Sequence, residues 1–101
     1  MKLWLDDERE APSGWAHART VQVALFKLLE WHRVNGGISE MSLDHDLGTG
    51  QPTGYDLLYC MARLHLTVPT ITVHSMNPEG KAQMEAFIER MELQQPLDAP
   101  G

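Results

Sequence analysis

Apolar residues gather in short runs along the chain, and each run stops abruptly at polar or charged residues. Such a run is typical of a buried strand that delivers a loop at its carboxyl end. A Pro/Gly-rich loop precedes residues 16–20, which are expected to form an additional, edge-like strand. The clearest runs are residues 1–5 before Asp6-Asp7 and 68–73, with Pro69 near its start, before His74-Ser75. Residues 38–43, in which Ile38, Met41 and Leu43 alternate only loosely with polar residues, are expected to form another strand before Asp44-His45-Asp46.

Apolar residues at helical spacing predict three helices between and after these strands. Each helix has a start signal, namely Thr20, the capping box of Thr53 and Asp56, or the pair Asn77-Pro78. The predicted helices cover residues 21–34, which Asn35-Gly36-Gly37 ends, residues 53–65, and residues 78–94, which Gln95-Pro96 follow.

Strands that alternate with helices imply right-handed crossovers and a mostly parallel sheet of about four strands flanked by three helices. We therefore expect a small three-layer α/β fold. With 101 residues, 43% of them hydrophobic, the chain is long enough for one compact core. A single domain is expected over residues 1–95, followed by a flexible C-terminal tail over residues 96–101.

Composition narrows the classes of function. The net charge of −6 argues against an extended nucleic-acid surface, which is usually basic, although one nucleotide or an RNA terminus could still bind locally. No apolar run approaches the roughly 20 residues of a membrane span, and no apolar signal segment follows Lys2, so we expect a cytoplasmic protein without membrane contact. The single cysteine, Cys60, excludes an internal disulfide.

Carboxylates give the strongest chemical signal. If their strands are neighbours, Asp6, Asp7, Asp44 and Asp46 meet at one edge of the sheet, where ligands bind in folds of this kind. Like charges this close either stay partly protonated or share a cation, and an oxygen-rich, partly open site suits Mg²⁺ or Mn²⁺. We favour the cation and expect Asp6, Asp7 and Asp46 to hold it.

Two histidines lie in the same polar turns. His45 or His74 could add a nitrogen ligand, shifting the preference toward Mn²⁺ or another transition metal, or could transfer a proton near neutral pH. The residues alone leave these roles open. His74 could equally have only a structural role, with its ring nitrogens hydrogen-bonded at the end of its strand. Asp44, His45 and His74 are the candidate catalytic residues. Trp4 and Trp31 are expected in the core.

The turn before the third predicted helix offers an anion site. Free N–H groups at a helix start attract phosphate, Ser75 can donate a hydrogen bond to it, and Gly80 would let it approach the backbone. Arg9 can bind phosphate bidentately or neutralise the acid pair. We expect Arg9, Ser75, Asn77 and Gly80 to bind substrate, with capping of the helix as the alternative for Ser75 and Asn77.

Four ordered motifs span roughly residues 2–91. They are Leu5-Asp6-Asp7-Glu8-Arg9 with Pro12 and Gly14-Trp15, Ser42-Leu43-Asp44-His45-Asp46-Leu47-Gly48, Thr53-Gly54-Tyr55-Asp56, and His74-Ser75-Met76-Asn77-Pro78-Glu79-Gly80. Together they resemble the cyclic-phosphate processing receiver-like domain family, a divergent relative of response-regulator receivers. The resemblance implies a receiver-like, that is flavodoxin-like, fold. It also implies that Asp6 and Asp7 correspond to the receiver's metal-binding acid pair, and Asp44 or Asp46 to its phosphoacceptor.

Two departures from the receiver pattern favour processing or sensing of phosphate over signalling. No fifth strand carrying the receiver's lysine is expected after the last helix, and that lysine normally pairs with the phosphoryl group. The segment between the first two strands also lacks room for a full helix.

Our leading hypothesis is a metal-dependent phosphoesterase that acts on a cyclic phosphate of a nucleotide or RNA end. The first alternative is a non-catalytic receiver derivative that binds a nucleotide or phosphate, or accepts a phosphoryl group on aspartate. The second is a small protein-interaction module with an acidic pocket. The expected partner is a phosphate-containing small molecule or an RNA terminus, and pairing of helix faces could form a homodimer.

Overall fold

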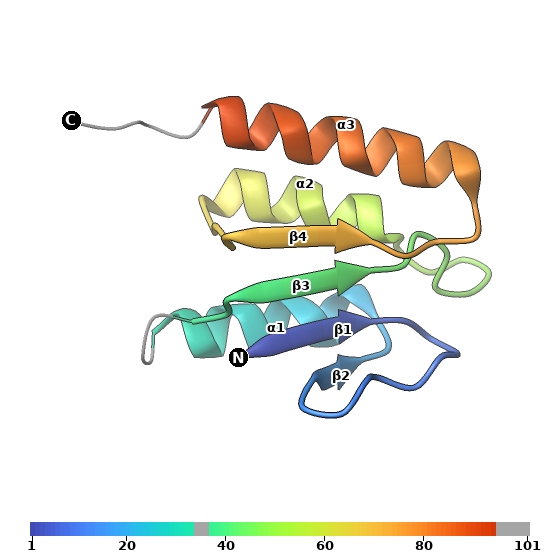
Figure 1. Cartoon of the computed structure of the whole chain (residues 1–101), viewed down its shortest axis with the longest axis horizontal. Coiled ribbons are helices and arrows are strands. Elements are labelled where there is room, and N and C mark those ends of the chain that lie inside the picture. The colour runs from blue at the N-terminus through green and yellow to red at the C-terminus, as the bar shows by residue number, and fades with distance from the viewer. Residues whose placement is uncertain (34–36, 95–101) are drawn as a thin grey trace.

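The structure, a computed structural model, describes residues 1–33 and 37–94, with side chains placed as far as Met91 (Figure 1). The expected stop signal at Asn35-Gly36 and the expected tail over residues 96–101 lie outside the described residues. In chain order the elements are β1 (Lys2–Leu5), β2 (Ala16–Ala18), α1 (Val21–His32), β3 (Glu40–Leu43), α2 (Gly54–Leu64), β4 (Thr70–Val73) and α3 (Pro78–Gln94).

All four strands run parallel in one sheet with the order β2-β1-β3-β4. Paired residues form rows across it, so that Leu3 pairs with Met41, and Met41 with Ile71. The edge strand β2 ends at Ala18, earlier than expected, because Thr20 is used to start α1. The Thr20 hydroxyl accepts a hydrogen bond from the Val23 N–H at 3.2 Å, as the capping signal predicts.

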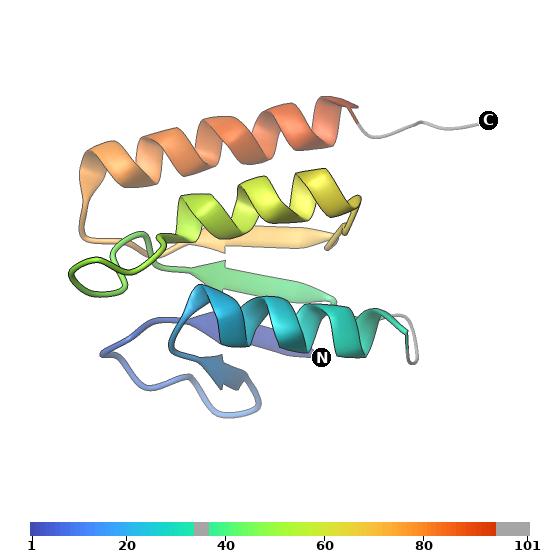
Figure 2. The same cartoon turned by 180° about the vertical axis from the view of Figure 1, so that it is seen from behind.

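The helices gather on one side of the sheet. Figures 1 and 2 show α1 and α2 over the same face, and α3 contacts both α2 and β4. The crossovers through α1 and α2 lead in the same direction across the sheet, and right-handed crossovers in one direction place their helices on one face.

The parallel sheet and its three helices confirm a receiver-like, flavodoxin-type α/β fold. Among the described residues, however, the helices and the sheet form two layers, where three were expected, because the connection between β1 and β2 contains no helix. Across the same residues, no helix is both long and apolar enough to cross a membrane.

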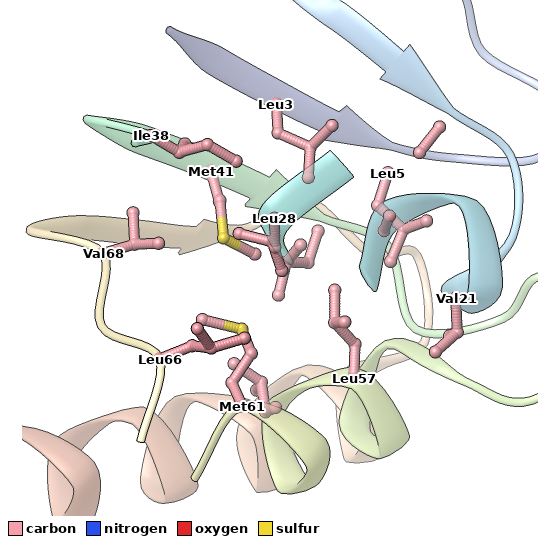
Figure 3. Packing of buried hydrophobic residues seen from close by; sticks show 14 of the residues in the cluster. Leu3, Leu5, Val21, Leu28, Ile38, Met41, Leu57, Met61, Leu66 and Val68 are labelled. Carbon is pink, nitrogen blue, oxygen red and sulfur yellow. The ribbon is translucent and has the colours of Figure 1, made fainter. Parts of the chain in front are cut away.

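The hydrophobic core fills the space between the sheet and the helices (Figure 3). From the sheet, Leu3, Leu5 and Met41 are fully buried, and they are joined in the core by Leu57 and Met61 of α2. Fully burying a side chain of this size contributes about 1.5–3 kcal/mol relative to leaving it exposed. Burial of alternate strand residues therefore fixes which face of the sheet the helices cover.

The remaining strand residues form the opposite face, because successive side chains in a strand point to opposite sides. We call this surface the Trp4 face; its residues are Lys2, Trp4, His17, Glu40, Ser42, Thr70 and Thr72. The expectation that Trp4 lies in the core is wrong, since it alternates with Leu3 and Leu5, and its half-buried ring meets that of Trp15 edge to face.

Candidate functional site

Asp6, Asp44 and His74 lie side by side at the carboxyl end of the sheet. Each directly follows the last residue of its strand, and the backbone ladder continues through them. The Asp44 N–H donates to the Leu5 carbonyl and the His74 N–H to the Leu43 carbonyl, both at 2.9 Å. One ligand atom from each of the three side chains lies within 4.8 Å of the other two. We call these three residues the acid–histidine cluster.

Asp6 is almost completely buried, with 2% of its surface exposed. Its Oδ1 accepts hydrogen bonds from the N–H groups of Glu8 at 2.8 Å and Arg9 at 2.9 Å, and its Oδ2 lies 3.0 Å from His74 Nε2. Burial alone would raise the pKa of Asp6, but these N–H donors and His74 outweigh it and hold the pKa below the usual value. Asp6 is therefore a permanent anion at neutral pH.

Asp44 behaves in the opposite way. Burial raises its pKa, and the nearby charge of Asp6 adds to the rise, although the His45 N–H and the Ser75 hydroxyl favour the ionised form. The His45 N–H lies 2.7 Å from Asp44 Oδ1. A pair of carboxylates with opposite shifts marks a place where a cation or a proton would relieve repulsion.

His74 is held on two sides. Its Nδ1 lies 2.7 Å from the hydroxyl oxygen of Ser42, and its ring stacks on Trp4 with centroids 3.9 Å apart and planes 6° from parallel. Trp4 in turn donates its indole N–H to the Arg9 carbonyl at 3.1 Å. Sequence reasoning missed both contacts; the one available signal for Ser42 was a serine between the apolar residues Met41 and Leu43, directly before the Asp44 turn.

A cleft of about 480 Å³ opens over the acid–histidine cluster. Asp7 and Arg9, which were expected at the site, line this cleft. Glu8 lines it as well, although no role was expected for it from the sequence. Its lining residues are Asp6, Asp7, Glu8, Arg9, Asp44, Asp46, Gly48, Thr49, His74 and Met76. The volume lies in the range of small-molecule sites.

Asp46 also lines the cleft, but its side chain is exposed and turned toward its neighbours. Its carboxylate lies 2.8 Å from His45 Nδ1 and accepts a hydrogen bond from the Asn77 amide at 3.4 Å. The contact with His45 lowers the pKa of Asp46. The structure thus separates the two acids of this turn, with Asp44 inside the cluster and Asp46 beside it.

The other residues expected to bind substrate build the start of α3. The Ser75 hydroxyl accepts from the Asn77 N–H, and the Asn77 side-chain oxygen accepts from the Gly80 N–H, each at 3.0 Å. Gly80 is buried under the His45 ring, and a Cβ at this position would collide with that ring. The side chains of Ser75 and Asn77 and the N–H of Gly80 are therefore already used at the start of α3. His45, which packs against Gly80, does not belong to the cleft lining.

Gly54 fixes the position of the Asp44 turn against α2. Its N–H donates to the His45 carbonyl at 2.9 Å, and a Cβ at Gly54 would collide with the Asp44 carbonyl oxygen. The predicted capping box is confirmed directly beside it, where Thr53 and Asp56 exchange hydrogen bonds between side chain and backbone. Only a residue without a side chain lets the helix begin this close to the strand end.

The acid–histidine cluster could hold a metal ion. Two carboxylates and one imidazole suit Mn²⁺ or another borderline ion, and the carboxylates alone suit Mg²⁺. This donor set differs from the expected metal ligands, since Asp7 and Asp46 lie on the cleft wall outside the cluster, whereas Asp44 and His74 belong to it.

Most of the chain matches a known protein family. The family model described as the cyclic-phosphate processing receiver domain matches residues 1–90. No curated protein and no solved structure matches the chain significantly. The match covers every residue of the acid–histidine cluster and of its cleft, and it supports a phosphate-related role. The chain belongs to the cyclic-phosphate processing receiver domain family.

Proposed function

We propose that the protein is a metal-dependent phosphoesterase that opens a cyclic phosphate of a nucleotide or an RNA end. The observation that carries the proposal is the convergence of Asp6, Asp44 and His74 within 4.8 Å under an open cleft. The family description supplies the chemical class of the substrate. A net charge of −6 favours a small substrate over an extended nucleic acid.

The cluster residues would hold the divalent ion, which when bound polarises a phosphoryl oxygen and lowers the pKa of a coordinated water. Arg9, on the cleft wall, would pair with the oxygens of the phosphate. Asp44, which directly follows β3 and lines the cleft, would take a proton from the attacking water and return it to the leaving ester oxygen.

The reaction is a balanced hydrolysis. The water oxygen forms a new bond to phosphorus, one of the two ring P–O bonds breaks, and the leaving oxygen receives a proton. The product is a phosphate monoester beside a free hydroxyl. Proton transfer by His45 is the weaker alternative, because its ring packs against Gly80 and His45 does not belong to the cleft lining.

The experiment incubates the protein and Mn²⁺ with 2′,3′-cyclic nucleotides, 3′,5′-cyclic nucleotides and RNA ending in a 2′,3′-cyclic phosphate, and follows monoester formation by ³¹P NMR. Asp6→Asn and Asp44→Asn should each lower the rate by more than about 100-fold, since even residues that only orient ligands cost about 10–100-fold. Glu30→Gln, which alters an exposed acid on α1, is the matched control. A panel left intact by protein that binds Mn²⁺ would refute the proposal.

One observation bears on the receiver-type alternative, in which an aspartate accepts a phosphoryl group. Asp44 directly follows β3 and faces the cleft, as a phosphoacceptor would, but among the described residues Arg9 is the cation of the cleft lining and no lysine takes part. Incubation with acetyl phosphate distinguishes the two functions. An acyl phosphate that disappears in Asp44→Asn, without turnover of cyclic phosphates, would favour the receiver function.

A further inference from the structure

Ser42 is a buried hydroxyl in β3, between the buried apolar residues Met41 and Leu43. Only 6% of its surface is exposed, and Asp6 and Ser42 are the buried polar side chains among the described residues. A buried polar group needs a hydrogen-bond partner, and the partner of Ser42 is Nδ1 of His74 at 2.7 Å. The hydroxyl therefore decides which ring nitrogen of His74 faces the sheet and which faces the carboxylates.

The hydroxyl suits both protonation patterns of a neutral imidazole, because it can donate or accept. In the metal-free neutral ring with its proton on Nε2, Nε2–H would donate to Asp6 Oδ2, 3.0 Å away, and the Ser42 O–H would donate to Nδ1, 2.7 Å away. With a metal on Nε2, the ring proton would be on Nδ1, and Nδ1–H would donate a hydrogen bond to the Ser42 hydroxyl oxygen. In both cases Nε2 stays directed at the carboxylates.

Trp4 restrains the same ring in a different way. Its indole stacks on His74 with the planes 6° from parallel, so rotation of the imidazole would open the contact. Ser42 thus sets which nitrogen points inward, and Trp4 sets the plane of the ring. Partners of this kind tune metal ligands by fixing their tautomer and orientation.

We propose that Ser42 is the positioning residue of His74, holding Nε2 toward Asp6 and Asp44 so that the cluster binds a transition metal. The inference rests on the metal site of the proposed function, but not on turnover of any substrate. It predicts that loss of the hydroxyl weakens metal binding by about 10–100-fold, the usual effect of removing a partner that orients a ligand.

The first test measures Mn²⁺ affinity by calorimetry for the wild type and for Ser42→Ala and Ser42→Thr. The alanine variant should bind about 10–100-fold more weakly, whereas the threonine variant, which keeps the hydroxyl, should stay within about threefold. Ser39→Ala removes an exposed hydroxyl that donates to the Met1 carbonyl, and should leave affinity unchanged. A threefold or smaller loss in Ser42→Ala would overturn the proposal.

A double-mutant cycle separates positioning from general structural damage. Ser42→Ala should have no further effect on Mn²⁺ affinity once His74→Ala has removed the imidazole. An equal loss in both backgrounds would show that Ser42 acts on the fold and would overturn the inference.

Nitrogen NMR of the imidazole tests the same point in the wild type, so it does not depend on how a variant folds. The metal-free protein should show the Nε2–H tautomer of His74, and Zn²⁺ should bind Nε2 and leave the proton on Nδ1. Zinc on Nδ1, or a metal-free mixture of tautomers, would overturn the inference. Failure of every metal to bind would instead refute the proposed metal-dependent function. The tautomer of the metal-free protein would still show whether Ser42 directs Nε2 of His74 toward the carboxylates.

Discussion

The two faces of the sheet use alternate residues of the same strands for different purposes. On the helix-covered face, Leu3, Leu5 and Leu43 are fully buried against the helices. On the Trp4 face, Trp4 and Ser42 hold the ring of His74. In β1, β3 and β4 the odd-numbered residues build the core, and the even-numbered ones lead to the acid–histidine cluster.

Neighbouring residues of one strand therefore serve different properties. One side chain packs in the core and stabilises the fold, and the next one faces the side of the sheet that supports ligand binding. A substitution on the helix-covered face leaves a cavity in a packed interior. A substitution on the Trp4 face alters orientation and charge at the strand ends instead. The two kinds of change should therefore be separable by experiment.

Leu5→Ala should have the largest effect on stability. Because Leu5 is fully buried, the variant should lose about 2–5 kcal/mol of unfolding free energy, measured by urea denaturation. Its folded fraction should bind Mn²⁺ within about threefold of the wild type. Ser42→Ala should lose only about 1 kcal/mol, the net value of one hydrogen bond. Equal losses of stability in the two variants would contradict the division between faces.

Gly54→Ala should come next, at about 1–3 kcal/mol, because the added methyl group collides with the Asp44 carbonyl and must push α2 away from β3. Since Asp44 belongs to the cluster, Mn²⁺ affinity should fall as well. The comparison variant is Gly80→Ala, whose methyl group meets the His45 ring, which lies outside the cleft lining. If Gly80→Ala weakened Mn²⁺ binding more than Gly54→Ala, the link between the α2 start and the cluster would be wrong.

Asp44→Asn and Asp6→Asn should change stability in opposite directions, by smaller amounts. Burial raises the pKa of Asp44, so its charge disfavours the fold at pH 7, and Asp44→Asn should raise Tm in EDTA. That gain should shrink as pH falls through the raised pKa and vanish below the usual value of 3.8. Measuring Tm between pH 7 and pH 3 checks this.

Asp6 follows the reverse rule. Its N–H donors and His74 outweigh burial and hold its pKa low, so its charge stabilises the fold above pH 3.8 and this contribution disappears as pH falls through the lowered pKa. Asp6→Asn should therefore lower Tm at pH 7 and converge with the wild type in acid. Shifts of the same sign in the two variants would contradict the assigned environments.

Lys2→Ala should have the smallest effect. Its ammonium group lies 3.7 Å from the Glu40 carboxylate on the Trp4 face, and the two side chains are 49% and 31% exposed. Exposed pairs are worth less than about 1 kcal/mol and weaken with salt. Urea denaturation at low and high salt measures the contribution, and a loss comparable to that of Leu5→Ala would show that the Trp4 face also carries the fold.

Much of the fold was predictable because strand ends leave a clear mark in the sequence. Asp6, Asp44 and His74 each follow an apolar run at once, and parallel strands bring such residues to one edge. The number of layers was not predictable from helix count alone. It depends on the crossover directions, which follow from the strand order and from the missing helix between β1 and β2.

The finer features of the site depend on contacts between strands. Ser42 and His74 lie 32 residues apart, and nothing local to either shows that they meet. The choice between Asp44 and Asp46 likewise depended on a contact between strands, since the Asp44 N–H donates to the Leu5 carbonyl and this places Asp44 beside Asp6. Asn77 caps α3 by accepting from the Gly80 N–H, as one of the two alternatives from the sequence held, and Ser75 binds the N–H of Asn77 just before the helix.

The cluster draws one residue from the end of each of three strands, and Asp6 and His74 are 68 residues apart in the chain. An unfolded chain cannot present these ligands together, so an ion bound there would select the folded molecule. At a free concentration 100 times its Kd, such an ion would add about 2.7 kcal/mol to the unfolding free energy. Metal binding would then slow amide hydrogen exchange in all three strands together. The fraction of protein that holds a metal would therefore determine how often the chain unfolds.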